Sequence, residues 1–360
     1  MTKLSKNKVI LGLSGGVDST AAALLLKEQG LEVTGYYFDI TGKGGKGKED
    51  AELAAEKLGI RLICEDVSEE FDRKIISSFC DDYCSGRTPN PCIFCNPLIK
   101  FRKLIETADR EGAYYIATGH YAGVFHDVEK DAYFVKKGAS IKKDQSYMLY
   151  RLGQDVLSRV IFPLNGFEEK ETIREIARKS DLPNADAGDS QEICFIDEKA
   201  ESRATYMIRR GCSAHEGNFV DADGKILGTH KGILNYTIGQ RKGLGIALGK
   251  PAFVTSINPE KNEVVLGENE DLFKKEVISV NNVFTSSYFK DRIEEGNEIE
   301  ITAKIRYAAK HAKGRIKKTA EGKILTAFEE PQRAPAPGQS VVFYDGDCVI
   351  GGGIIYSEQR

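Results

Sequence analysis

A glycine-rich turn between a buried strand and a helix constrains the fold of this 360-residue chain more than any other feature. The stretch VILGLSGGVDSTAAALLL, residues 9–26, starts as a short apolar strand, turns at Ser14 to Ser19 and continues as an apolar helix. Backbone amides in such a turn, together with the helix dipole, form an anion site. The lysine of the Walker phosphate loop is absent, and Asp18 supplies a carboxylate, most simply for magnesium. The sequence therefore predicts a phosphate-binding loop of another kind.

Strand and helix patterns alternate through the N-terminal half of the chain. We expect strands at Val9–Leu13, Val33–Phe38, Arg61–Cys64 and Tyr114–Thr118. We expect helices at Ser19–Gln29, from about Glu49 to Leu58, from about Ser68 to Cys84 and at Ile99–Glu111. Alternating units of this kind build an α/β domain with a parallel sheet, whose ligands bind at the carboxyl ends of the strands.

The sequence changes character after about residue 200. Turn signals such as DADG, NPEKN and DGD multiply, and segments of alternating polarity such as EIEITAKIRY and QSVVFYD dominate. This pattern is typical of β-rich modules. We therefore expect three domains: an α/β domain at 1–202, a small β-rich central domain at 203–270 and a C-terminal β-barrel at 271–360.

Composition narrows the class of protein. Hydrophobic residues make up 41% and charged residues 29% of the chain, as in an ordinary globular protein. The leader MTKLSKNK is short and polar, and the first apolar stretch is interrupted at Ser14 to Asp18, so we expect neither a signal peptide nor a membrane span, and a cytoplasmic protein. The sequence does not fix the oligomeric state, for which a monomer is our expectation. The net charge of −3 confines any nucleic-acid surface to a local patch. Eight cysteines without an export signal should be reduced, so a close pair indicates metal binding or catalysis.

The stretch TPNPCIFCNP carries such a pair, Cys92 and Cys95. Prolines this dense predict a stiff, extended loop. The two thiols are compatible with a disulfide, a zinc site, an iron–sulfur cluster or a reactive thiolate. Cys80 and Cys84 precede them, and C-x3-C-x7-C-x2-C would suit a closed zinc site. Three further cysteines are predicted to be small core residues: Cys64, Cys212 and Cys348.

SGGVDS resembles the loop of enzymes that split ATP between its α and β phosphates. Further stretches extend the resemblance over essentially the whole chain: NPCIFCN, YIATGHYA, KKDQSYMLY, DSQEICFI and YTIGQRKGLG. Together they resemble the tRNA-specific 2-thiouridylases, which replace the C2 oxygen of the wobble uridine, position 34, with sulfur. The resemblance implies an ATP-pyrophosphatase-type N-terminal domain, Mg²⁺-ATP as the energy source and release of AMP and pyrophosphate.

The resemblance also implies residue roles. Cys194 would carry a persulfide sulfur to the adenylated base, and Cys95 would release the product through a transient disulfide with Cys194. A thiolate at these positions requires a positive or dipolar setting that lowers the thiol pKa. The residues that match the ATP site are Gly12, Leu13, Ser14, Gly15, Gly16, Val17, Asp18, Ser19, Phe38 and Gly119.

Two basic windows suit the tRNA partner. Residues 301–320 hold seven Lys or Arg and no acid, and residues 136–151 hold five against one Asp, although such runs are also typical of solvated faces. The resemblance implies contact with the flipped target base or the tRNA by Asn90, Pro91, Cys92, His120, Lys143, Asp144, Gln145, Arg306, Tyr307 and Gln339. A buried structural role for His120 is the alternative.

One position departs from the family pattern, because many relatives carry an aspartate where this chain has Cys92. Cys92, Cys95 and Cys194 form a set of three thiols, which would suit a [4Fe-4S] cluster that binds sulfide. The sulfur carrier is therefore either a persulfide on Cys194 or such a cluster. The resemblance also implies tRNAs of the Lys, Glu and Gln type and a cysteine desulfurase or sulfur-relay protein as partners. Two other hypotheses are an adenylating ligase such as an amidotransferase and a zinc-stabilised RNA-binding protein.

Overall fold

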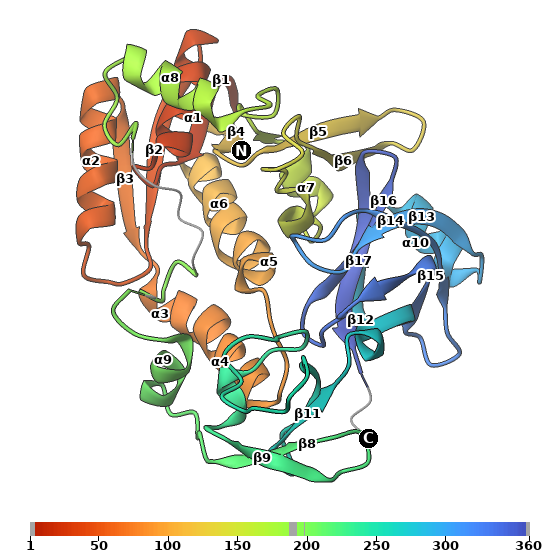
Figure 1. The fold of residues 1–360 in the computed structure, drawn as a ribbon. Coiled ribbons are helices and arrows are strands. Elements are labelled where there is room, and N and C mark those ends of the chain that lie inside the picture. Colours follow the sequence, from red (N-terminus) through yellow and green to blue (C-terminus); the bar gives the residue numbers. More distant parts are fainter. Residues whose placement is uncertain (1–3, 187–192, 198, 358–360) are drawn as a thin grey trace.

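In a computed structural model the chain forms three modules built on separate sheets (Figure 1), and residues 4–186, 193–197 and 199–357 are described. The first sheet has five strands, the second has four, and the third closes into a barrel. The predicted α/β class with a small β-rich central module and a C-terminal barrel is confirmed.

The N-terminal sheet is parallel, with the strand order β3-β2-β1-β4-β7. Its strands are β1 (Ser5–Gly12), β2 (Glu32–Asp39), β3 (Arg61–Asp66), β4 (Ala113–Thr118) and β7 (Val160–Ile161). The helices of this module are α1 (Val17–Glu28), α2 (Lys46–Leu58), α3 (Ser68–Phe71), α4 (Ser77–Cys84), α5 (Pro91–Cys95), α6 (Arg102–Glu111), α7 (Gln154–Leu157) and α8 (Lys170–Lys179). The order of the strands reverses direction at β1, so the crevice between the ends of β1 and β4 is the expected ligand site.

Strand β1 shows how the sheet is buried on both faces. Val9 and Leu11 pack into one core with residues of α1, α2 and α8, such as Ala21 and Ile173. Ile10 points the other way and packs with α6. Side chains alternate along a strand, so a continuous apolar run is what a sheet covered on both faces requires.

The proline-rich segment is helical, and the predicted extended loop is wrong. Asn90 caps helix α5, because its side-chain oxygen accepts a hydrogen bond of 3.1 Å from the backbone N–H of Cys92. Pro91 occupies the first helical position, where its missing N–H costs nothing. Pro97 lies in the first turn of a π-helical segment, Asn96–Phe101, which joins α5 to α6. The prolines therefore fix where the helix starts and where it widens.

The central module is a four-stranded sheet preceded by helix α9 (Arg203–Arg209). Its strands are β8 (Gly217–Val220), β9 (Ile226–His230), β10 (Phe253–Asn258) and β11 (Glu263–Gly267), in the order β10-β11-β8-β9. A small core that includes Phe219, Val254 and Val264 packs against one face.

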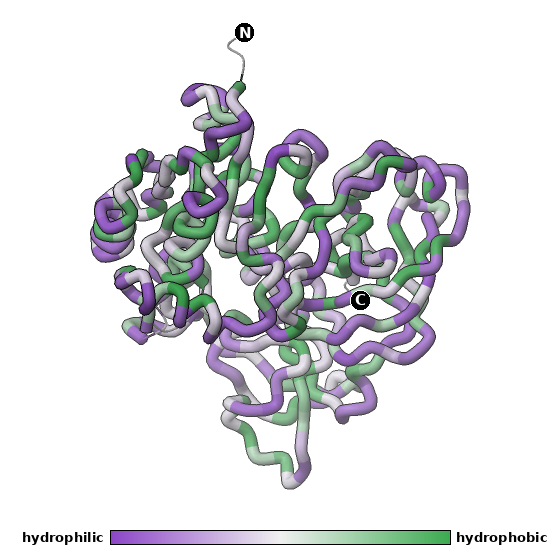
Figure 2. The backbone as a smooth tube through the Cα atoms, turned by 90° about the horizontal axis from the view of Figure 1, so that it is seen from above, coloured by the Kyte–Doolittle hydropathy of each residue, from purple (hydrophilic) through white to green (hydrophobic). Residues whose placement is uncertain are grey.

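The C-terminal module is a barrel that closes through the pairing of β12 with β17. Its elements are β12 (Phe273–Phe284), α10 (Ser287–Glu294), β13 (Ile299–Lys304), β14 (Ala312–Lys318), β15 (Ile324–Arg333), β16 (Ser340–Asp345) and β17 (Cys348–Tyr356). A hairpin of the N-terminal module, β5 (Ala122–Asp127) and β6 (Ala132–Lys137), joins the barrel where Lys136 pairs with Cys348. Hydrophilic stretches follow the outer turns of all three modules (Figure 2). No described helix is long and apolar enough to cross a membrane.

Candidate active site

The SGGVDS loop is ordered by its own hydroxyl groups. The backbone N–H of Ser14 donates to Ser19 Oγ at 3.1 Å, and Ser19 Oγ donates to the Gly16 carbonyl at 3.0 Å. Gly15 has a φ of +76°, and a Cβ there would lie within 2.6 Å of the Ala51 nitrogen on α2. Only glycine fits this approach. The loop therefore presents its amides at the N-terminus of α1, as an anion site requires.

Asp18 is held by two partners from distant parts of the chain. Its Oδ1 accepts a hydrogen bond of 2.8 Å from the Tyr121 hydroxyl, and its Oδ2 lies 2.9 Å from the ammonium of Lys170. Lys170 is the first residue of α8, and its side chain is only 13% exposed. Both carboxylate oxygens thus have a partner within the protein, so a magnesium ion would compete with Lys170 for Asp18. The loop lacks a Walker lysine, yet a lysine lies against it, and sequence reasoning missed this residue.

Three other residues matched to the ATP site also meet here. A Cβ on Gly12 would lie 3.4 Å from the ring of Phe38, which stands at the end of β2. A Cβ on Gly119 would lie 3.0 Å from the Ser19 nitrogen, so the chain after β4 passes directly over the start of α1. The structure therefore brings the predicted ATP residues together at the carboxyl ends of β1, β2 and β4.

The cysteines gather in two sets of three, and the four cysteines of the alternative zinc site, Cys80, Cys84, Cys92 and Cys95, do not form one group. Cys95 interacts with Cys92, its neighbour on α5, and with Cys194, whose flanking residue Phe195 packs into the same core. Cys80 and Cys84 lie instead with Cys212. Residues 189–192 of the DSQEICFI motif lie outside the described residues. Within the described ranges, no three His, Cys, Asp or Glu side chains are placed to hold a metal ion together, so neither set fits a metal centre in this arrangement.

Lys100 is the cation of the first thiol set. Its side chain is half-buried, one turn beyond Cys95, and its charge interacts with the thiols of Cys95, Cys92 and Cys194. Burial disfavours the ammonium, but the neighbouring sulfur atoms outweigh burial and raise the pKa of Lys100. Sequence reasoning missed this residue too, although a lysine near a cysteine pair in a helical segment was a usable signal.

The thiols themselves are not activated in this state. Burial raises the pKa of Cys95 to about 12, and Lys100 only partly offsets it. Burial also raises the pKa of Cys194, whose side chain reaches solvent but is surrounded by protein atoms. The expectation of a lowered thiol pKa is therefore wrong for this structure, because desolvation outweighs one ammonium.

His120 is a neutral, enclosed histidine. Its Nδ1 is 2.7 Å from the Thr118 hydroxyl, and its ring stacks on Phe101 at a centroid distance of 6.0 Å. Burial and, secondly, the charge of Lys100 lower the pKa of His120 to about 3. The ring therefore offers a neutral hydrogen-bonding edge close to the thiol set.

Comparison with known proteins identifies the family. The description "tRNA methyl transferase HUP domain" matches residues 7–198, "tRNA methyl transferase PRC-barrel domain" residues 206–268 and "Aminomethyltransferase beta-barrel domain" residues 282–355. The tRNA-specific 2-thiouridylase MnmA 1 of Caldanaerobacter subterraneus subsp. tengcongensis is 49% identical over 98% of this chain and 99% of its own. The tRNA-specific 2-thiouridylases MnmA of Clostridium acetobutylicum (97% and 99% covered) and Clostridioides difficile (97% and 98%) are each 46% identical. The chain belongs to the tRNA-specific 2-thiouridylase family.

In this thiouridylase-family chain the barrel touches the segment that leads into α5. Gln339 donates a side-chain hydrogen bond of 2.7 Å to the Thr88 carbonyl, and the Thr88 N–H donates to Pro337 at 2.8 Å. Arg306 donates to the Arg333 carbonyl at 2.9 Å, within the barrel. Gln339 is therefore anchored beside Asn90, Pro91 and Cys92, whereas Arg306 is engaged elsewhere.

The two basic windows meet although they are far apart in the sequence. Lys304 of the barrel interacts with both Asp144 and Lys137, and its ammonium lies 5.5 Å from the ring centre of Tyr307. Burial, more than Lys137, lowers the pKa of Lys304. Asp144 is buried, and it accepts hydrogen bonds from the backbone of Gly138 and Ser146. The aspartate thus shapes the loop, and it leaves the 95%-exposed Ile141 at the surface.

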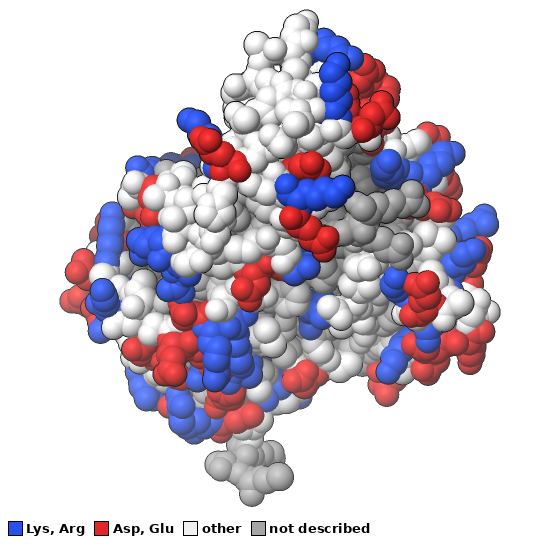
Figure 3. All heavy atoms as spheres, turned by 90° about the horizontal axis from the view of Figure 1, so that it is seen from below, with Lys and Arg blue, Asp and Glu red and all other residues white. Residues whose placement is uncertain are grey.

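Part of the window at residues 301–320 is an ordinary solvated face. Arg315, Lys317 and Lys318 on β14 pair with acidic residues on β13, just before β13 and on α10. Basic and acidic side chains are also interspersed over the face in Figure 3. The end of the window near Lys304 therefore remains as the candidate tRNA patch of this family member, and it would act through the half-buried Arg306 and the exposed Lys310, because Lys304 itself is buried.

Gln145 also has a structural contact, since its side-chain oxygen accepts a hydrogen bond of 3.0 Å from the backbone N–H of Tyr121.

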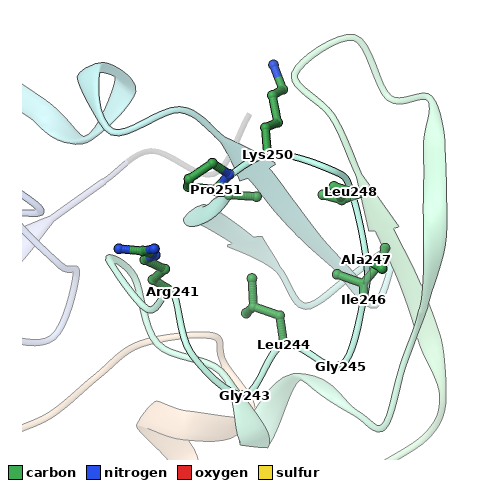
Figure 4. A pocket seen from close by; sticks show the side chains of 10 residues that line it. Arg241, Gly243, Leu244, Gly245, Ile246, Ala247, Leu248, Lys250 and Pro251 are labelled. Carbon is green, nitrogen blue, oxygen red and sulfur yellow. The ribbon is translucent and has the colours of Figure 1, made fainter.

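A separate pocket of about 400 Å³ lies in the central module, and no cysteine lines it. Its wall is the loop from Arg241 to Ala252, where Leu244 points inward and Lys250 points away (Figure 4).

Proposed function

We propose that the chain catalyses ATP-dependent 2-thiolation of the wobble uridine of tRNA. The observation that carries this proposal is the placement of two assemblies in one module. The anion site of SGGVDS lies at the ends of β1 and β4, and a set of three thiols with one lysine lies on α5 and around Cys194. Family membership favours the same reaction.

The first step is activation of the base by ATP. The C2 oxygen of uridine attacks the α-phosphorus, the bond to the β-phosphate breaks, and pyrophosphate leaves. Loop amides, the hydroxyls of Ser14 and Ser19 and the ammonium of Lys170 suit the departing phosphates, because each is a donor or a cation at the helix N-terminus. Magnesium bound with ATP would supply further charge neutralisation, with Asp18 as a ligand once Lys170 turns to the phosphates.

The second step is sulfur transfer. The terminal sulfur of a Cys194 persulfide attacks C2, and AMP leaves with the former C2 oxygen. A Cys95 thiolate then attacks Cys194 Sγ, which breaks the bond between the two persulfide sulfurs. The base keeps its new sulfur as 2-thiouridine, and Cys95 and Cys194 form a disulfide that an external dithiol reduces.

Lys100 is the residue that we assign to thiolate stabilisation. Both cysteines have raised pKa values in the structure, so the Cys194 thiol must lose a proton when it takes up the persulfide sulfur, and the Cys95 thiol must lose one when it attacks Cys194. A cation that interacts with both sulfur atoms lowers the cost of that proton loss. His120, neutral at pH 7, would orient the base by hydrogen bonding rather than by charge.

The tRNA and the sulfur source are the proposed partners. An anticodon loop with its target base flipped out would bind to the patch near Lys304, the loop with Lys143 and the residues Asn90 to Cys92. Flipping the base costs a few kcal/mol. A cysteine desulfurase or a relay protein would load the persulfide. We place the reaction in the cytoplasm, with tRNAs of the Lys, Glu and Gln type.

The test separates the two chemical steps. With unmodified tRNA, Cys194→Ser should still release pyrophosphate but form no 2-thiouridine by nucleoside mass spectrometry. Cys95→Ser should accumulate tRNA attached to Cys194 through sulfur. Full thiolation by Cys194→Ser would overturn the assignment of the sulfur carrier.

Metal analysis addresses the alternative carrier. The described thiols are not placed as ligands of one ion, so we derive no step through a cluster. Anaerobically purified protein would be analysed for iron and sulfide. If both are present in constant proportion to the protein and are lost in Cys92→Ser, a cluster and not a persulfide carries the sulfur. A colourless, iron-free protein that thiolates tRNA would support the persulfide.

A further inference from the structure

The second set of thiols lies outside the site described above. Cys80 and Cys84 stand one turn apart near the end of α4, and Cys212 follows α9. The Cys212 thiol is in hydrogen-bond contact with the thiols of both Cys84 and Cys80, and it also reaches the Cys80 carbonyl at 4.0 Å. The prediction that Cys64, Cys212 and Cys348 are small core residues is wrong for Cys64, which is exposed, and incomplete for Cys212, which is half-buried and in contact with two other cysteines.

These three cysteines differ in access to solvent. Cys80 is buried in the core that α4 shares with α9, whereas Cys84 is exposed and Cys212 is half-buried. A small oxidant can therefore reach Cys84 and Cys212, and Cys80 is shielded. Burial, with the hydrogen bond from Cys212, raises the pKa of Cys84 to about 12, so the resting pair is a dithiol.

The surrounding contacts hold the two segments in register. The Arg203 guanidinium of α9 lies 4.7 Å from the ring centre of Tyr83, the residue before Cys84. Arg210 forms an ion pair with Asp72, which lies in the π-helical segment Asp72–Ile76 that joins α3 to α4. The contact of Cys84 with Cys212 is therefore part of a packed interface between α4 and α9 rather than a chance approach of two mobile side chains.

We propose that Cys84 and Cys212 are a redox modification site that closes into a reversible disulfide. Two S–H bonds break and one S–S bond forms, and the two electrons and two protons reduce a peroxide to two waters. An external dithiol reopens the bond by exchange. Cys80 stays reduced beneath the pair.

A disulfide between Cys84 and Cys212 would link the two segments that carry the first thiol set. Cys84 precedes the segment that carries Cys92 and Cys95, and Cys212 follows the segment that carries Cys194. The disulfide would therefore join, from outside, the two chain segments that bring the first thiol set together. A cross-link across so long a loop should also restrict the unfolded chain strongly.

Peptide mapping tests the proposal directly. The full-length Cys92→Ser, Cys95→Ser, Cys194→Ser variant is treated with hydrogen peroxide, alkylated, digested without reductant and analysed by mass spectrometry. We expect one cross-linked peptide that joins Cys84 to Cys212 and disappears with dithiothreitol. The oxidised protein should melt several degrees higher than the reduced one.

Matched variants make each outcome decisive. Cys212→Ser in the same background should abolish the cross-link and the melting shift, whereas Cys64→Ser should change neither. The wild-type chain, which keeps all its thiols, repeats the mapping in case the triple variant folds poorly. Recovery of Cys84 and Cys212 as separate thiols or sulfinic acids would overturn the proposal, and so would a bond from either one to Cys80.

Discussion

Lys170 should bind the phosphates of ATP, and Lys170→Met is the variant that tests it. The ammonium is 2.9 Å from Asp18 and its side chain is 13% exposed, so the charge is held in place beside the anion site. A hydrogen bond between charged groups contributes about 1.5–3 kcal/mol. At about 2 kcal/mol, its loss should weaken ATP binding about 30-fold.

The expected loss depends on which phosphates the ligand carries. We expect the affinity for ATP and for pyrophosphate to fall about 30-fold and that for AMP to fall less than about 3-fold, because AMP lacks the β and γ phosphates. Isothermal titration calorimetry measures all three. Lys179→Met is the matched control: Lys179 is on the same helix, is 79% exposed, pairs with Glu175 and should leave all three affinities unchanged.

Asp18 supplies the experiment that could refute this reasoning. If Lys170 merely neutralises Asp18, then Asp18→Asn combined with Lys170→Met should restore the affinity for ATP measured without magnesium, where Asp18 has no metal to bind. If Lys170 contacts the phosphates, the double variant should stay weak. Restored affinity, or an equal loss for AMP and ATP, would show that the lysine only shapes the loop.

Three further predictions concern the rest of the site. Lys100→Met should slow alkylation of Cys194 by iodoacetamide at neutral pH about tenfold and shift the pH profile of alkylation to higher pH, because the cation that favours the thiolate is lost. Lys100→Arg, which keeps a cation, should recover part of the alkylation rate. Gly15→Ala should lower the free energy of unfolding by on the order of 2 kcal/mol in urea titration and abolish ATP binding, because its Cβ would meet the backbone of α2. The wild-type protein should lose stability as the pH falls from about 6.5 towards 3. His120 has a pKa of about 3 in the folded protein, so in this range it takes up a proton only when the chain is unfolded, and the free energy of unfolding falls by at most about 1.4 kcal/mol per pH unit. In His120→Gln this part of the slope should disappear from urea titrations between pH 6 and 4.

The sequence predicted the parts of the fold that depend on local periodicity. Strand β1, the turn at Ser14 and helix α1 follow from one apolar run and one glycine pair, and the structure confirms them within a few residues. The barrel and the central sheet followed from alternation and turn signals. The fold class could therefore be predicted, because the spacing of apolar residues within each strand or helix shows which of its faces is buried.

Other features were hidden because they depend on contacts across the chain. The sequence shows Cys80 and Cys84 close to Cys92, but the helix that carries the first pair directs it toward α9 and Cys212. Proline density predicted an extended segment, although proline in a first turn supports a helix as readily. Neither the turn that holds Asp18 nor the start of α8 indicates that Lys170 will lie beside it.

The resting structure also bears on when the thiols become reactive. Cys95 is only 6% exposed, so stray oxidants do not reach it, and with a pKa of about 12 its thiol stays almost fully protonated at pH 7 until something favours the thiolate. Lys100 interacts with both Cys95 and Cys194, and loss of a proton from either sulfur would leave a compact ion pair. Closure over a bound anticodon loop would exclude water and strengthen that attraction, because charges interact more strongly in a low-dielectric site. On this argument thiolate formation follows tRNA binding, and alkylation of Cys194 should therefore be faster with bound tRNA wherever the base leaves the sulfur accessible.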